Sequence, residues 1–289
     1  MNRRELLASM PWLAASLGAP VSGAGVKSRF RTAICAYSFR DALKNKSMTY
    51  EDLVRLASDL DVDGLDLTVY WFPNTSDEFL MPLRRAAYKM GVDIYSISIS
   101  TDMCKPPGDT RDAEVAKVKG WVDAAAKLGA GHIRVFGGHV PKGSTEADAA
   151  TWCADTLKVC AEYSSGKGVI LGLENHGGIT ERAETIIQIV KKVDSPWVGI
   201  NLDTGNFDRD GYNQIEMCVP YAVNVQVKVD IRVEAGKPEK QDWGRIAAML
   251  AKGGYRGYLA LEYEDKEDPA SVMPRLMSEL TKIARKYTA

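Results

Sequence analysis

The stretch Ala222-Val-Asn-Val-Gln-Val-Lys-Val-Asp-Ile231 alternates branched apolar residues with polar ones. Successive side chains of a β-strand point to opposite faces, so this period of two predicts a strand with one apolar and one polar face. An isolated strand of this kind is typical of a surface sheet with one wet face. Helical segments flank this run on both sides, so we interpret the valine face as covered by helices. The polar face then lines the interior of a barrel.

Three further apolar runs share a second feature, a carboxylate where the run ends. Residues 168–174 end in Glu174, residues 198–203 end in Asp203, and residues 258–262 end in Glu262. An apolar run that delivers a carboxylate at its C-terminal end is typical of a barrel strand that carries active-site chemistry. Because helical segments separate these runs from one another and from the first one, the four together indicate one shared site.

Strand-like and helix-like segments alternate along the rest of the chain. Eight such pairs in 289 residues predict an α/β protein with a single (β/α)8 TIM barrel, which typically needs about 250 residues. A doubly wound sheet would need fewer strands or a second domain, and no Pro/Gly/Ser-rich linker divides the chain. Strands are predicted over residues 31–39, 64–71, 93–100, 132–137, 168–176, 198–204, 222–231 and 258–264, and helices over 49–61, 77–91, 112–129, 145–167, 181–193, 213–219, 242–253 and 269–287.

The first 25 residues differ in character from the rest. Arg3 and Arg4 precede a modestly apolar stretch, and small residues follow at positions 22–24. This pattern predicts a twin-arginine export signal over residues 1–25, a barrel over 26–289, and a periplasmic or otherwise exported protein. An ordinary amphipathic helix is the alternative, which Pro11 disfavours. No other stretch reaches the roughly 18 apolar residues of a membrane span.

Composition argues against several other classes of protein. The 37 basic and 38 acidic residues nearly cancel, giving a net charge of −1, and no long basic run offers a groove for a nucleic acid. Five cysteines are dispersed without CxxC spacing, which argues against a disulfide framework or a cysteine zinc site. We therefore expect a small-molecule partner. Whether the chain forms a homo-oligomer is left open.

Polar residues on the other predicted strands indicate a polar barrel interior, which suits a hydroxylated ligand. Barrel interiors also bury polar layers that never touch a ligand. Aromatic residues at positions 70–72 either form a wall for a sugar ring or belong to the core. The acidic stretch after Glu262, up to Asp268, is interpreted as a solvated loop. The polar sets are Asp66, Thr68 and Tyr70; Ser96, Ser98 and Ser100; and His132 and Arg134.

The three strand-end carboxylates are hard oxygen donors, which suit Mn²⁺ or Mg²⁺ better than a metal that prefers thiolates. A metal held by Glu174, Asp203 and Glu262 would bind adjacent oxygens of a sugar and stabilise charge on a carbonyl oxygen as a neighbouring proton leaves. One carboxylate can act as the base, and a second one opposite can return the proton.

Four segments carry a family resemblance: 173–178 (Leu-Glu-Asn-His-Gly-Gly), 202–206 (Leu-Asp-Thr-Gly-Asn), 221–228 and 257–262. With them the chain resembles the xylose isomerase-like TIM barrel superfamily, in its sugar phosphate isomerase/epimerase group, over about residues 31–287. The apurinic-site endonucleases of that superfamily use a multi-histidine zinc cluster. Three histidines cannot supply such a cluster, so nuclease activity is set aside.

The resemblance implies a metal site and an acid–base pair. In the epimerases of this group Glu, Asp, His and Glu hold the metal at the ends of strands five to eight, which match Glu174, Asp203, Gln226 and Glu262 here. The two glutamates are also the implied catalytic pair. Gln226 replaces a histidine, which leaves metal occupancy open and makes a three-ligand site the alternative. Mn²⁺ or Mg²⁺ is expected, with Co²⁺ or Zn²⁺ as alternatives.

Four further residues are predicted to bind the substrate: His176, Asn206, Lys228 and Arg232. Arg232 matches a substrate-binding arginine of the epimerases, and Asn206 belongs to one of the shared segments. His176 is either a hydroxyl-binding or acidic group, or a loop histidine bonded to backbone carbonyls. Lys228 either neutralises an enolate or a carboxylate, or forms a buried ion pair with Asp230.

These observations predict a divalent-metal-dependent sugar isomerase or epimerase that works by proton abstraction next to a sugar carbonyl, through an enediolate. A first alternative is a lyase or hydratase that acts on 3-keto-glycosides by β-elimination. A second alternative is a sugar-binding barrel without catalysis, to which the Gln226 replacement gives weight. Three retained carboxylates argue against that alternative, because like charges held together without a cation repel one another.

Overall fold

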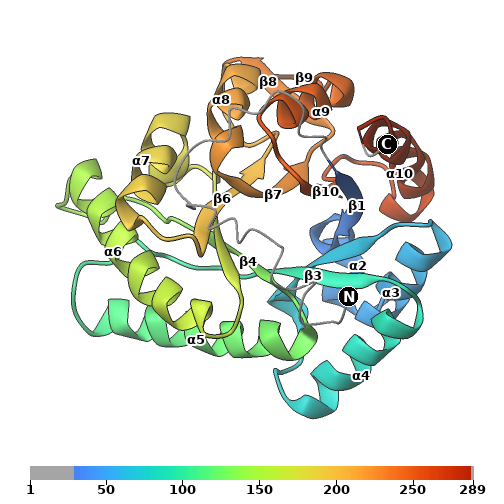
Figure 1. Cartoon of the computed structure of the whole chain (residues 1–289), viewed down its shortest axis with the longest axis horizontal. Coiled ribbons are helices and arrows are strands. Elements are labelled where there is room, and N and C mark those ends of the chain that lie inside the picture. The colour runs from blue at the N-terminus through green and yellow to red at the C-terminus, as the bar shows by residue number, and fades with distance from the viewer. Residues whose placement is uncertain (1–28, 288–289) are drawn as a thin grey trace, which may run out of the picture.

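The computed structural model describes residues 29–287, which form a closed barrel of eight parallel strands (Figure 1). The predicted TIM barrel is therefore confirmed. Neighbouring strands follow one another in the order β1-β10-β7-β6-β5-β4-β3-β2, and β1 closes the barrel against β10. The barrel strands are β1 (Phe30–Cys35), β2 (Gly64–Thr68), β3 (Asp93–Ser98), β4 (His132–Phe136), β5 (Ile170–Glu174), β6 (Val198–Asp203), β7 (Ala222–Val227) and β10 (Gly257–Leu261).

Helices surround this barrel, at least one after each strand (Figure 1). The sequence patterns did not predict the short helix α2 (Arg40–Asn45), which follows β1 directly through the 3-10 turn η1 (Ala36–Phe39). The 3-10 turns η2 (Val69–Trp71), η3 (Gly178–Thr180) and η4 (Val219–Tyr221) occupy loops between strands and helices. The longer helices are α3 (Tyr50–Asp59), α4 (Asp77–Lys89), α5 (Asp109–Leu128), α6 (Glu146–Ser165), α7 (Ala183–Val193), α8 (Gly211–Cys218), α9 (Trp243–Lys252) and α10 (Pro269–Arg285).

Local signals explain where helices begin. Thr49 and Asp52 form a capping box at the start of α3, in which each side chain accepts a hydrogen bond from the other residue's backbone N–H. Thr145 and Asp148 form the same arrangement at α6. Such a box satisfies N–H groups that have no partner inside the helix, so it holds the residue at which each helix leaves its loop.

The alternating stretch 222–231, predicted as one strand, is divided between two strands. β7 ends at Val227, and Asp230–Glu234 forms a separate strand, β8, paired antiparallel with β9 (Lys237–Lys240) in a hairpin. Asp230 lies 3.2 Å from Lys240, so the predicted alternative of a buried pair between Lys228 and Asp230 is wrong. The same period of two continues through both strands, so the pattern alone could not locate the break.

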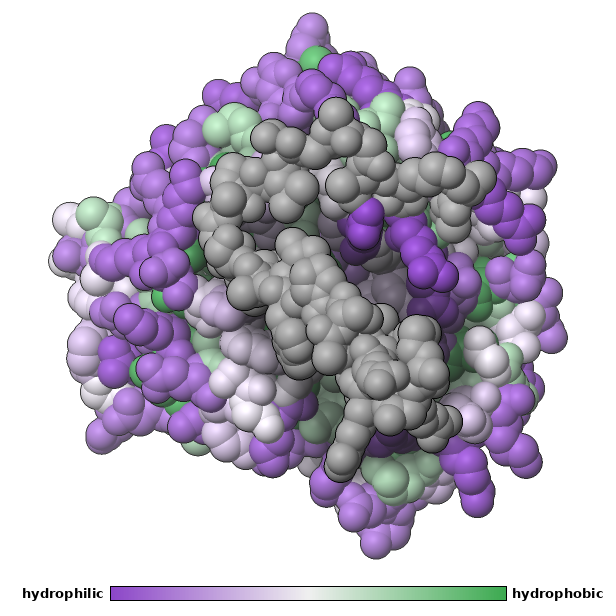
Figure 2. Space-filling model, in the orientation of Figure 1, coloured by the Kyte–Doolittle hydropathy of each residue, from purple (hydrophilic) through white to green (hydrophobic). Residues whose placement is uncertain are grey.

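The alternation within β7 has the predicted orientation. Val225 and Val227 lie in the apolar layer between strands and helices, while Asn224 and Gln226 are buried with partners from the opposite side of the barrel. Within residues 29–287 no helix is long and apolar enough to cross a membrane. The predicted export signal over residues 1–25 lies outside the described residues. Figure 2 shows a mostly hydrophilic rim on the face that Figure 1 views.

Candidate active site

Three carboxylates lie at the same end of the barrel, where β5, β6 and β10 end. Glu174 and Asp203 close β5 and β6, and Glu262 follows β10, and all three are buried. The ammonium of Lys228, just beyond β7, lies among them: its Nζ is 2.5 Å from Glu262 Oε1 and 3.4 Å from Asp203 Oδ2. Lys228 also contacts Glu264. The predicted solvated loop after Glu262 thus contributes a second carboxylate to the site.

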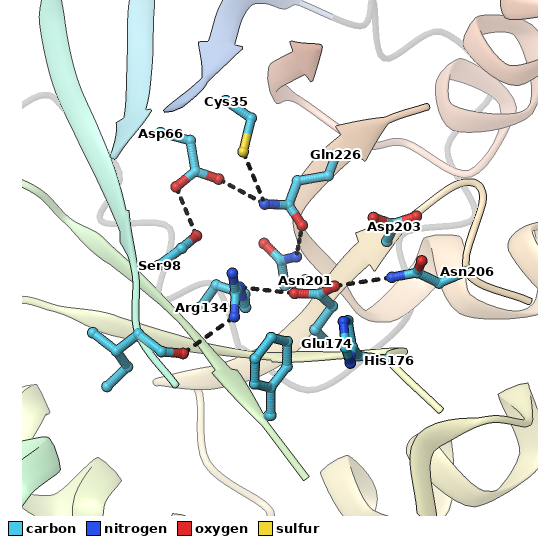
Figure 3. A network of polar contacts seen from close by, with 12 residues as sticks. Cys35, Asp66, Ser98, Arg134, Glu174, His176, Asn201, Asp203, Asn206 and Gln226 are labelled. Carbon is cyan, nitrogen blue, oxygen red and sulfur yellow. Dashed lines mark hydrogen bonds and ion pairs between the residues drawn. The ribbon is translucent and has the colours of Figure 1, made fainter. Parts of the chain in front are cut away.

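A second buried cation, Arg134, forms an ion pair with Glu174. The sequence indicated only that Arg134 is a polar residue of the barrel interior. Arg134 on β4 places Nε 2.8 Å from Glu174 Oε2 (Figure 3). Its Nη1 donates to the Ile99 carbonyl and to the Tyr70 hydroxyl. On the other side Asn206 donates to Glu174 Oε1 at 3.0 Å. An arginine on the inward-facing side of a predicted barrel strand is the signal that could have pointed to this role, because a buried guanidinium needs a carboxylate partner.

The surroundings shift the pKa values of the carboxylates in different directions. Burial raises the pKa of Glu174 well above its usual range, with Arg134 opposing and Asp203 adding to the rise. Burial likewise raises the pKa of Asp203 to about 7, although Lys228 opposes this. Burial would also raise the pKa of Glu262, but Lys228, with smaller contributions from Arg134 and Cys35, more than offsets it, so the net pKa lies below the usual range. Two carboxyl groups with separated pKa values are what an acid–base pair requires.

Glu174, Glu262 and Lys228 line a polar cavity of about 290 Å³. The ring of His176 packs on Phe136, with ring centroids 4.2 Å apart, and burial lowers its pKa, so the imidazole is neutral at pH 7. Neutral imidazole can both donate and accept a hydrogen bond, which suits a sugar hydroxyl. The cavity is lined by Tyr37, Tyr70, Ser100, Arg134, Phe136, Glu174, His176, Asn206, Lys228, Glu262 and Glu264.

Arg232 stands apart from the other predicted substrate-binding residues. It lies on β8, donates from Nη1 to the Gly205 carbonyl at 3.1 Å, and lines a neighbouring cavity of about 270 Å³. That cavity shares Asn206 and Lys228 with the central one. The β8–β9 hairpin therefore brings Arg232 to the edge of the site, where it can reach a group that extends out of the central cavity.

Gln226 has other partners than predicted. Its Oε1 accepts a hydrogen bond from Asn201 at 2.8 Å, and its Nε2 donates to Asp66 at 3.1 Å, both inside the barrel (Figure 3). In this arrangement its amide oxygen is not directed at the other three predicted metal ligands. Within residues 29–287 no three His, Cys, Asp or Glu side chains converge into a metal-binding group.

The three carboxylates nevertheless fit a divalent metal by donor type and charge. Glu174 Oε2 and Asp203 Oδ2 are buried, and neither accepts a hydrogen bond from a described residue; each faces a cation only as an ion pair. Buried acids in and below the cavity outnumber buried cations, with Asp66, Glu174, Asp203 and Glu262 against Arg134 and Lys228. An excess of buried negative charge requires bound protons or a bound cation.

Residues 54–283 match the xylose isomerase-like TIM barrel family, so the chain belongs to this family. The family resemblance of the four sequence segments is thereby confirmed. No curated protein matches the sequence.

Solved structures with the same fold differ widely from this chain in sequence. D-psicose 3-epimerase with D-tagatose from Clostridium cellulolyticum H10 is 16% identical with a TM-score of 0.71, covering 89% of this chain and 99% of its own. A probable 3-DHS dehydratase from Bacillus anthracis is 16% identical with a TM-score of 0.67, covering 87% and 98%. The zinc-containing IolI protein is 14% identical with a TM-score of 0.69, covering 89% and 98%. At these identities the likeness is one of fold.

Proposed function

We propose that this protein removes a proton next to the carbonyl group of a small carbohydrate and returns it, as a sugar isomerase or epimerase. The observation that supports this most directly is the pair Glu174 and Glu262, which share one polar cavity and have pKa values shifted in opposite directions. A D-psicose 3-epimerase among the structural neighbours is consistent with the proposal.

Each residue has a role that follows from its surroundings. Glu262, kept ionised by Lys228, is the base that takes the proton from carbon. The electron pair left behind forms an enediolate, whose negative oxygen the ammonium of Lys228 and the guanidinium of Arg134 stabilise. Glu174, whose pKa is raised by burial, returns a proton to carbon. His176 and Asn206 hold hydroxyl groups and so fix which carbon reacts.

We further propose a divalent metal as part of this site. Glu174, Asp203 and Glu262 would hold it, with Gln226 as a fourth ligand once its amide leaves Asn201. When bound, the metal would stabilise negative charge on substrate oxygens. Mn²⁺ or Mg²⁺ suits these oxygen donors best, and the zinc of the IolI neighbour makes Zn²⁺ worth testing.

A β-elimination on a 3-keto-glycoside is the second candidate, favoured by the dehydratase among the structural neighbours. Glu262 would again take the proton next to the ketone. Glu174 would give its proton to the departing oxygen, so a C–O bond breaks as the C=C bond forms. The product mixture separates the two candidates, because an isomerase conserves the mass of its substrate and an eliminase releases a leaving group.

Exchange of substrate hydrogen with solvent deuterium tests both candidates. A panel of ketoses and 3-keto-glycosides is incubated with the protein in D₂O, with and without Mn²⁺, and followed by NMR and mass spectrometry. We expect one or more compounds to exchange or eliminate, and Glu262→Gln and Glu174→Gln to slow this by about 10²–10⁴-fold.

The matched control is Glu216→Gln, on the exposed side of α8 in an ion pair with Lys252. This variant should keep the full rate. An unchanged rate in Glu262→Gln would overturn the assignment of the base. Binding of a panel compound without exchange in the wild-type protein would leave a sugar-binding barrel as the better account.

A further inference from the structure

A third cavity, of about 460 Å³, adjoins the polar one. Tyr70 and Ser100 line both, so the two spaces have a common wall. Unlike the central cavity, this one has mostly apolar side chains at its base. It is lined by Val69, Tyr70, Phe72, Asn74, Thr75, Ile99, Ser100, Lys117 and Trp121, and we call it the aromatic cavity.

Its aromatic side chains are held firmly by the core. Phe72 packs edge-on against Tyr50 and Phe79, with centroids 4.5 and 4.9 Å away, and its ring centroid lies 6.3 Å from that of Trp121. Val69 and Ile99 are buried. Rigid aromatic and branched walls bind a flat apolar group with little loss of side-chain freedom.

Tyr70 connects this cavity to the proposed chemistry. Its hydroxyl accepts a hydrogen bond from Arg134 Nη1 at 3.0 Å, and Arg134 in turn pairs with Glu174. Tyr70 is 39% exposed, a high value for an aromatic residue whose hydroxyl is already bonded. One molecule that reached from the carboxylates past Tyr70 would cover this surface.

The charge at the rim argues for a neutral occupant. Lys117 is the cation of the aromatic cavity, and its Nζ already lies 2.8 Å from Glu114, which a second lysine, Lys105, also contacts. A phosphate or carboxylate on the ligand would have to displace this pairing. An uncharged ring needs no such exchange, because its binding depends on the area removed from water.

We propose that the aromatic cavity is a second subsite, which binds an apolar ring attached to the carbohydrate in the polar cavity. The substrate class is then a glycoside that carries a ketone on its sugar ring and an aromatic or similar apolar aglycone, not a free sugar. This inference rests on the proposed function for its polar half, whereas the apolar half rests on the aromatic cavity itself.

Calorimetric titration with matched probes tests the subsite. The probes are phenyl β-D-glucopyranoside, methyl β-D-glucopyranoside and phenol, which combine or separate the polar and apolar parts. We expect the phenyl glycoside to bind the wild-type protein about tenfold or more tightly than the methyl glycoside. Trp121→Ala and Thr75→Trp should abolish that preference, the first by removing a wall and the second by filling the space.

Thr75 is exposed, so Thr75→Trp tests the subsite without opening a hole in the core. The control is Tyr88→Ala, which removes an exposed aromatic ring of α4 outside the aromatic cavity and should keep the preference. Equal affinity for both glycosides, a preference that survives Thr75→Trp, or no binding of either glycoside overturns the inference. The deuterium-exchange result with Glu174→Gln and Glu262→Gln does not depend on the aglycone, so failure of the subsite and failure of the proposed function are told apart.

Discussion

At the scale of single residues, Lys228 has the largest electrostatic influence on the site. It is buried and contacts Asp203, Glu262 and Glu264, which raise its pKa well above the usual range although burial alone would lower it. The sequence left two alternatives for Lys228: it neutralises an enolate or a carboxylate, or it forms an ion pair with Asp230. The structure replaces the second alternative by a cluster with three other acids, because the chain turns away from the barrel after Lys228.

Removing that charge should change both the pH profile and the stability. In Lys228→Met the burial of Glu262 is no longer offset, so its pKa rises and the acid limb of kcat/KM moves to higher pH. A buried pair broken on one side costs about 3–5 kcal/mol. In the wild-type protein the depressed pKa of Glu262 contributes stability above the unfolded-state pKa, and this is lost as pH falls through the folded-state pKa. The difference in unfolding free energy between the two proteins should therefore grow as pH rises from about 4.

The comparison variant is Lys228→Arg, which keeps the cation and should keep the acid limb near its wild-type position. Urea unfolding at a series of pH values and pH–rate profiles measure both effects. An acid limb that stays in place in Lys228→Met would show that Glu262 is not the base.

At the scale of elements, the barrel strands place inward-facing side chains in layers. At some positions in a layer, neighbouring side chains leave no space for any side chain larger than that of glycine. Gly172 on β5 faces the barrel interior, where an added Cβ would lie 2.2 Å from Nε2 of His132 and 3.0 Å from the side chain of Asn201. His132 in turn lies 2.8 Å from the hydroxyl of Ser96. The glycine thus allows two polar side chains from neighbouring strands to pack over β5.

Gly→Ala changes at two positions should have opposite effects on the free energy of unfolding. Gly172→Ala forces His132 from its place and should destabilise the fold by about 1–3 kcal/mol. Gly120→Ala, on the exposed side of α5 with no atom in the way, should stabilise by about 0.4–1 kcal/mol through the unfolded chain. Urea unfolding of both variants measures this. Equal effects would mean that the barrel interior rearranges freely around β5.

At the scale of the whole molecule, closure of the barrel creates the site. Pairing of β1 with β10 completes the ring, and five strands, β4 to β7 and β10, deliver the charged groups to one mouth. Residues as far apart in the chain as Arg134 and Glu262 share one cavity only in the closed form. A ligand that bridges several strands therefore stabilises the complete fold by mass action.

A divalent metal bound at the proposed site should stabilise the fold in this way. At a concentration of 100 times Kd, Mn²⁺ should add about 2.7 kcal/mol to the unfolding free energy. Thermal melts with Mn²⁺, Mg²⁺, Co²⁺ and Zn²⁺, together with elemental analysis of the purified protein, measure the effect. Glu174→Ala should lose it, and Gln226→Ala should keep it if the three carboxylates suffice. A wild-type protein with no bound metal and no response in the melt contradicts the metal proposal.

The local pattern by itself determined the barrel and the positions of its carboxylates. Alternation and apolar runs depend on neighbouring residues, so eight strands and Glu174, Asp203 and Glu262 at strand ends follow from the chain alone. The capping box at Thr49 likewise needs only four consecutive residues.

Only the tertiary structure decided which groups meet. The ion pair of Arg134 with Glu174, the bonds of Gln226 to Asp66 and Asn201, and the hairpin that takes Asp230 away from Lys228 join residues from different strands. Their energies depend on burial and on distances across the barrel, and no local pattern encodes either quantity.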